Sequence, residues 1–70
     1  MKSVSVYSII KKLKNEHVSL VNGDGYWYYV YDDEERGIFA TESVYVMYLN
    51  SMTVADWVEI GKDFIKKVEA

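Results

Sequence analysis

The stretch Gly25-Tyr-Trp-Tyr-Tyr-Val-Tyr31 decides the fold of this 70-residue chain, because it holds five aromatic rings in seven residues. Successive side chains of a strand point to opposite faces of a sheet. The stretch therefore has two faces, with Tyr26, Tyr28 and Val30 on one and Trp27, Tyr29 and Tyr31 on the other. Helices can cover one of these faces, whereas the other must meet water, a ligand or another chain.

Turn signals on both sides of this stretch predict an antiparallel meander. Asn22-Gly23-Asp24-Gly25 precedes it, and Asn and Gly tolerate the positive φ angles of tight hairpins. We therefore expect a short strand over residues 17–21, with Val18 and Leu20 facing inward. The aromatic strand follows over residues 26–31, and the polar residues 32–37 form the next hairpin loop.

Residues 38–49 read as one long strand or as two short ones. Regular alternation would place Glu42 on the same face as apolar residues such as Ala40 and Val44. We therefore expect a bend or bulge near Glu42-Ser43, since a bulge shifts the facing of the residues that follow it.

Helices are expected at both ends of the sequence. Apolar residues recur at helical spacing from Val6 to Leu13, which predicts a helix over residues 5–15 capped by Ser3 or Ser5. A strand through Val4 and Val6 is the alternative. The second helix should begin after Thr53 as its N-cap, with Asp56 completing a capping box and Met52 with Trp57 forming a hydrophobic staple.

The second helix has a buried stripe that includes Gly61. Glycine in a helix interior costs roughly 1 kcal/mol relative to Ala, so we expect close approach to an aromatic side chain of the sheet. The side chains predicted to be mostly buried are Ile10, Leu13, Val18, Leu20, Trp57, Phe64 and Ile65.

The fold class is therefore α+β, as a single small domain over residues 1–70. The order is αβββα, a three-stranded antiparallel meander with both helices packed on one face. No Cys and only one His are present, so the sequence predicts no disulfide and no zinc site to help stabilise so small a chain.

Charge is distributed unevenly along the chain, whose net charge is −3. Residues 17–59 carry eight acidic residues against Arg36 alone, whereas the lysines lie toward the two ends. An acidic strand region argues against phosphate-backbone binding there. The N-terminus lacks the apolar core of a signal peptide, and no apolar run has the length of a membrane span. We therefore expect no membrane association and a cytoplasmic location.

Three stretches, Gly25–Asp33, Glu42–Asn50 and Met52–Trp57, resemble small hypothetical proteins encoded by tailed phages and prophages. The resemblance covers roughly residues 5–65. It implies a bacterial cytoplasmic setting and a phage accessory role, and it identifies no site.

The uncovered face of the aromatic strand is the predicted partner-binding site. We expect Trp27, Tyr29 and Tyr31 to be the outer set, with Tyr28 and Val30 facing the helices. The acidic loop, including Asp32 and Asp33, would form the rim. Tyr and Trp are enriched at the energetic centres of protein interfaces. The function predicted is a small non-enzymatic module that binds a protein partner or itself as a homodimer.

A nucleic-acid-associated module is the alternative, in which sheet aromatics would stack on bases and helix lysines would contact phosphates. Catalysis is not predicted, because His17 lacks a visible nucleophile and orienting group. Gly23-Asp24-Gly25 opens no helix and so is no phosphate loop. The acidic loop lacks the spacing of a calcium site. No cofactor, metal or small-molecule substrate is expected.

Overall fold

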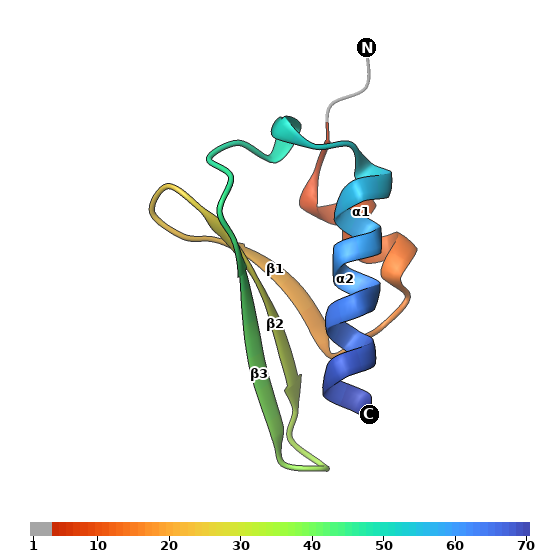
Figure 1. Cartoon of the computed structure of the whole chain (residues 1–70). Helices are drawn as coiled ribbons and strands as arrows, with labels where there is room; N and C mark the ends of the chain where they lie inside the picture. The colour runs from red at the N-terminus through yellow and green to blue at the C-terminus, as the bar shows by residue number, and fades with distance from the viewer. Residues whose placement is uncertain (1–3) are drawn as a thin grey trace.

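The structure is a computed structural model that describes residues 4–70. Its elements follow the order α1 (Val6–Leu13), β1 (Val18–Asn22), β2 (Trp27–Asp33), β3 (Ile38–Val44), a short 3-10 helix η1 (Leu49–Ser51) and α2 (Val54–Glu69). The strands form one antiparallel sheet in the order β1-β2-β3, and both helices lie on one face of it (Figure 1). The predicted αβββα fold is confirmed.

The first helix begins and ends through local backbone chemistry. The Ser5 hydroxyl accepts a hydrogen bond from the Ser8 backbone N–H at 3.2 Å, and the Ser8 side chain returns the contact to the Ser5 backbone. Lys14 ends the helix in the left-handed region at φ 52°, where its N–H bonds the Ile10 carbonyl. A helix rather than a strand therefore follows Ser5, and it is shorter than the predicted 5–15.

The second helix begins as predicted. The Thr53 hydroxyl accepts from the Asp56 N–H at 3.1 Å, and the Asp56 carboxylate accepts from the Thr53 N–H at 3.3 Å. Both contacts satisfy N–H groups that lack partners inside the helix. Met52, which precedes the cap, packs against the buried core that contains Trp57.

The third strand differs from its prediction in two respects. It pairs with β2 without interruption from Ile38 opposite Asp33 to Val44 opposite Trp27, so no bulge occurs at Glu42-Ser43. Glu42 instead stays on the inner face at the sheet edge, where its carboxylate meets Lys67 Nζ at 3.2 Å. The strand ends at Val44, whose carbonyl accepts from the Val46 N–H. A strand continuing to residue 49 is therefore wrong.

The core lies between the sheet and the two helices. Five of the seven residues predicted to be buried are buried, whereas Ile10 and Ile65 are half-buried. Ile9 is completely buried in place of its neighbour Ile10. The buried apolar residues are Ile9, Leu13, Val18, Leu20, Tyr29, Tyr31, Trp57, Val58 and Phe64.

Gly61 marks the closest approach of α2 to its neighbours. A Cβ at this position would lie 2.8 Å from a methyl carbon of Leu13 and 3.2 Å from the ring of Tyr29. The predicted close approach to a sheet aromatic is confirmed, and the tightest contact is with α1. Glycine therefore lets α2 pack against both layers at once.

Candidate protein-binding surface

The structure reverses the predicted orientation of the aromatic strand. Tyr29 and Tyr31 are completely buried beneath the helices, so neither lies on an exposed face. The Tyr29 hydroxyl donates to the Trp57 carbonyl of α2, and its ring lies near those of Trp57 and Phe64. The prediction that these residues form the outer set is wrong.

The other predicted site residues divide between the two faces. Trp27 is half-buried on the inner face, where its Nε1–H donates to the Met47 carbonyl at 3.3 Å. Asp33 is also on the inner face and only 3% exposed. Asp32 alone is exposed, on the opposite face of β2. The structure therefore does not bring the predicted set together on one surface.

The number of residues in the turn of the first hairpin explains why Tyr29 and Tyr31 face inward rather than outward. The turn is closed by a 2.8 Å hydrogen bond from the Gly23 N–H to the Tyr26 carbonyl, and Gly25 supplies the positive φ at 85°. This turn pairs Leu20 with Tyr29 directly across the sheet. Directly opposed residues share a face, so the inward Leu20 brings Tyr29 inward. Placing Tyr28 inward would need one residue more or less between the strands.

The outer sheet face carries a cluster of three tyrosines. The ring of Tyr26 lies 5.9 Å from that of Tyr28 and 5.9 Å from that of Tyr45. These separations lie in the range of favourable aromatic pairs. Tyr26 and Tyr28 are half-buried, whereas Tyr45 is 84% exposed. The cluster is thus ordered by its own contacts and still open to solvent.

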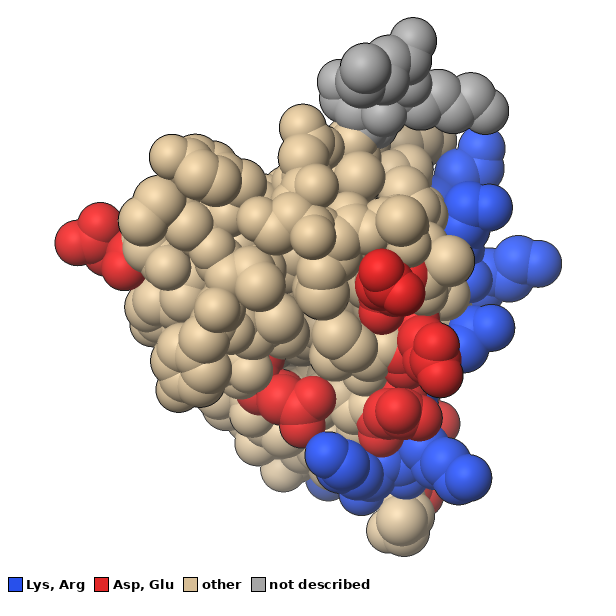
Figure 2. Space-filling view, turned by 45° about the horizontal axis from the view of Figure 1, so that its top comes forward, with Lys and Arg blue, Asp and Glu red and all other residues tan. Residues whose placement is uncertain are grey.

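The connection from β3 to α2 carries further exposed apolar side chains. It runs across the end of the sheet that also holds the β1–β2 turn (Figure 1). Met47 is 60% exposed and Tyr48 is 68% exposed. Residues 43–55 contain no charged side chain. Figure 2 shows a broad uncharged area on the side away from the lysines. We call the set Tyr26, Tyr28, Tyr45, Met47 and Tyr48 the tyrosine surface.

Sequence reasoning missed the exposed part of this surface because it placed residues 45–49 in a strand. The length of β2, the strand that pairs with β3, could have predicted where β3 ends. β2 has seven residues, so it can pair with only seven residues of β3. Beyond Val44 the chain has no strand beside it, and Tyr45, Met47 and Tyr48 then fall in the connection.

A second cluster of polar groups joins the opposite end of the sheet to the end of α2. The Arg36 guanidinium donates through Nε to Asp33 and through Nη2 to the Tyr31 hydroxyl at 2.7 Å. That hydroxyl lies 2.7 Å from a carboxylate oxygen of Glu69. We call Tyr31, Asp33, Arg36 and Glu69 the hairpin clasp. Its hydrogen bonds hold the β2–β3 hairpin to the last turn of α2.

The clasp shifts the titration of its members. The hydrogen bond from the Arg36 side chain, with a second from the Arg36 backbone N–H, holds the pKa of Asp33 below its ordinary value of 3.8. The hydrogen bond with Glu69, followed by burial, raises the pKa of Tyr31. Elsewhere on β2, burial first and the Glu42 carboxylate second raise the pKa of Tyr29. These tyrosines therefore remain neutral hydrogen-bonding groups.

His17 borders the hairpin clasp and lies among acidic side chains. Its Nε2 lies 3.6 Å from Asp33 and 3.7 Å from Glu16, at the rim of an acidic pocket of about 300 Å³. The pocket is lined by Glu16, His17 and the four acidic residues 32–35. Its lining has no Ser, Thr, Cys or Lys that His17 could activate. Among residues 4–70, no group of three or more potential metal ligands is assembled.

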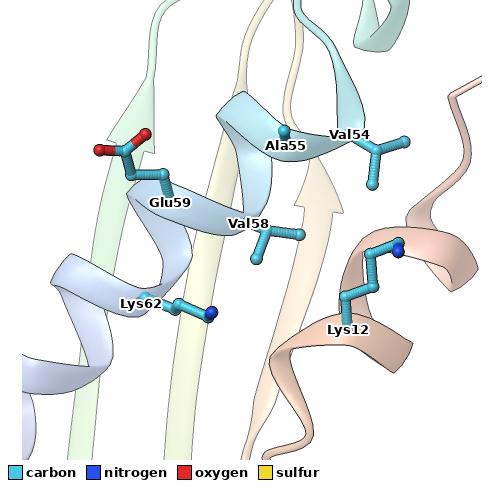
Figure 3. A pocket seen from close by; sticks show the side chains of 6 residues that line it. All are labelled: Lys12, Val54, Ala55, Val58, Glu59 and Lys62. Atoms are coloured by element: carbon cyan, nitrogen blue, oxygen red, sulfur yellow. The ribbon is translucent and has the colours of Figure 1, made fainter.

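A groove of about 500 Å³ lies between the two helices. Figure 3 shows Lys12 of α1 facing Val54 and Val58 of α2 across it. Glu59 and Lys62 complete its rim. No hydrogen bond or ion pair joins these charged groups within the described part of the chain. The groove therefore has an apolar floor with charged side chains at its rim.

Comparison of the chain with protein-family models, curated proteins and solved structures found no match. Within residues 4–70, neither helix combines the length and the apolar character needed to cross a membrane. The geometry of the surfaces described above is therefore the basis for assigning a function.

Proposed function

We propose that this protein is a small non-enzymatic interaction module that binds a protein partner or itself through the tyrosine surface. The observation that carries the proposal is the exposure of Tyr45, Met47 and Tyr48 on a connection without charge. Tyr and Met are enriched in protein interfaces, and charged residues are depleted at their centres. The neighbouring pair Tyr26 and Tyr28 adds partly buried aromatic contact area.

The position of the lysines supports a protein partner over nucleic acid. Every lysine in the described chain lies on α1, on its C-cap Lys14 or on α2. The helices cover one face of the sheet, whereas Tyr28 lies on the other. Base stacking and phosphate contacts would therefore need opposite sides of the protein. The resemblance of the sequence to phage-encoded proteins supports a phage or prophage accessory role in a bacterial cell.

The proposal can be tested by placing a photo-crosslinking amino acid on the tyrosine surface in living bacteria. Tyr48 is replaced with p-benzoylphenylalanine, and Tyr7, which is 74% exposed on α1, receives the same replacement as the matched control. We expect one discrete crosslinked product from position 48 and none from position 7. A product of twice the chain mass would identify self-association, and any other mass would identify a different protein partner.

A second substitution links the product to the surface. Tyr45→Ser in the chain labelled at position 48 should strongly reduce the crosslinking yield, because it removes the most exposed ring of the tyrosine surface. The folded state of each variant is checked by circular dichroism. Equal labelling from positions 7 and 48, or no discrete product from position 48, would contradict the proposal.

A further inference from the structure

The outer edge of β3 has a hydrogen-bonding pattern that the two hairpins determine. In an antiparallel pair, directly opposed residues alternate between exchanging both backbone hydrogen bonds and exchanging none. The Gly23–Tyr26 bond and the bond from the Asp32 N–H to the His17 carbonyl show that even-numbered residues of β2 bond to β1. Odd-numbered residues of β2 therefore bond to β3, and Tyr29 exchanges its bonds with Glu42.

Three residues of β3 consequently direct their backbone groups away from the sheet. They are the residues between the bonded positions, namely Phe39, Thr41 and Ser43. Within residues 4–70, no hydrogen bond from another segment reaches their N–H or C=O groups. Strand edges of this kind are templates for pairing with another chain.

Most of the features that protect strand edges are missing from β3. The strand has no Lys, the chain has no Pro, and the register with β2 is uninterrupted by a bulge. Glu42 is the one inward-pointing charge, and Lys67 of the same chain neutralises it at 3.2 Å. The exposed face of the strand carries Phe39, Thr41 and Ser43, none of which is charged, and Phe39 is 68% exposed.

We propose that a second copy of this chain pairs antiparallel with β3 about a two-fold axis through Thr41. Because the three unpaired residues are consecutive along the edge, an axis through the middle one matches every free N–H with a free C=O of the partner. Thr41 then lies opposite Thr41 of the second copy, and Phe39 lies opposite Ser43. Thr–Thr pairs across strands are favourable. The two three-stranded sheets would join into one continuous sheet.

The side chains on the inner face also fit this pairing. Each Glu42 would lie opposite the small Ala40 of the other copy, which leaves room for the Glu42–Lys67 ion pair. A two-fold interface uses the same patch on both copies, and an unrelated peptide would not be constrained to this match. The inference adds to the proposed function and does not depend on it, because backbone groups rather than the tyrosine surface make the contact.

The pairing is tested by the oligomeric state of the full chain in sedimentation velocity. The wild type should show a concentration-dependent dimer. Thr41→Lys should raise the dimer dissociation constant by roughly tenfold or more, because it places two like charges side by side at the axis. Ser19→Lys adds the same charge to the outer face on the opposite edge strand and should leave dimerisation unchanged.

Mixing charges tests the position of the axis. Thr41→Glu alone should also weaken the dimer, whereas an equimolar mixture of Thr41→Lys and Thr41→Glu chains should form a heterodimer. Circular dichroism verifies that each variant is folded. A mixture that remains monomeric, a dimer insensitive to Thr41→Lys, or equal effects of Thr41→Lys and Ser19→Lys would overturn the proposal.

Hydrogen exchange gives a residue-level readout on the unmodified protein. The amides of Phe39, Thr41 and Ser43 should become protected as the concentration rises through the dimer range. The amides of Ala40 and Glu42 should be protected at every concentration, because they bond to β2. A wild type that is monomeric at all concentrations, or unprotected amides at positions 39, 41 and 43 in a dimer, would overturn the pairing. Crosslinking from Tyr48 is a separate result and would still support the tyrosine surface.

Discussion

The two sides of β2 carry similar residues and have different roles. On the inner side, Tyr29 and Tyr31 are completely buried and use their hydroxyls to bond α2 and the hairpin clasp. On the outer side, Tyr28 is half-buried, lies opposite Val21 and Ser43 of the two neighbouring strands, and has its ring 5.9 Å from that of Tyr26. Composition does not distinguish the two tyrosine sets. Their roles follow from the number of residues in the β1–β2 turn, because this number determines which alternate side chains of β2 face the core and which face the surface.

The largest expected difference between the two sides is in the stability of the fold. Tyr29→Ala should cost about 3–5 kcal/mol, because it empties a fully buried aromatic site between the sheet and α2. Tyr28→Ala should cost roughly 1 kcal/mol or less, as expected for a partly exposed position on a sheet. Urea denaturation of the two variants and of the wild type measures both values. Equal losses would show that the two sides of β2 are packed alike, contrary to the structure.

A smaller loss of stability is expected when a methyl group is added next to the inner or the outer face of β2. Gly61→Ala gains roughly 1 kcal/mol of helix propensity. It also forces a Cβ to within 2.8 Å of the buried Leu13 and 3.2 Å of Tyr29. Overpacking costs typically 1–3 kcal/mol, and neither neighbour has solvent to move into. We therefore expect a net loss of about 1 kcal/mol.

Gly23→Ala is the control for this substitution on the outer side. A Cβ at Gly23 would lie 2.6 Å from the ring of Tyr26, but this ring is half-buried and can turn toward solvent. The loss of stability should therefore be smaller than for Gly61→Ala. Thermal unfolding of both variants compares them. A Gly61→Ala protein more stable than the wild type would show that the inner side has space the structure does not show.

The sequence was sufficient to predict the elements of the fold and insufficient to orient the central strand. Helical spacing and the Thr53 capping box depend on neighbouring residues, so α1 and α2 could be located from short segments. The facing of Tyr29 depends on the exact number of residues in the turn after Asn22, and several turns are compatible with Asn-Gly-Asp-Gly. An error of one residue exchanged the predicted inner and outer sets.

The position of the exposed aromatic rings was predicted wrongly. The excess of rings within residues 25–31 predicted an exposed set on that strand, but Tyr29 and Tyr31 are buried, and the rings Tyr45 and Tyr48 are exposed in the connection instead. The predicted bend at Glu42 was wrong because a long-range ion pair with Lys67 makes the inward charge tolerable. Local patterns contain no information about a partner 25 residues away in the sequence.

The smallest difference between the two sides concerns two adjacent aspartates and should depend on pH. The hydrogen bonds from Arg36 lower the pKa of the buried Asp33 below 3.8 in the folded protein, so the unfolded chain takes up the proton first as the pH falls. The stabilisation from this carboxylate is therefore complete above pH 3.8 and is lost as the pH falls through the lower folded pKa.

Asp33→Asn should reduce the stability of the fold near pH 6 and flatten the dependence of stability on pH below pH 4. Asp32→Asn makes the same substitution on the exposed side of β2 and is the control for loss of one negative charge. Unfolding midpoints from pH 2 to pH 6 measure the difference, and equal profiles for the two variants would show that the hairpin clasp contributes nothing specific to stability.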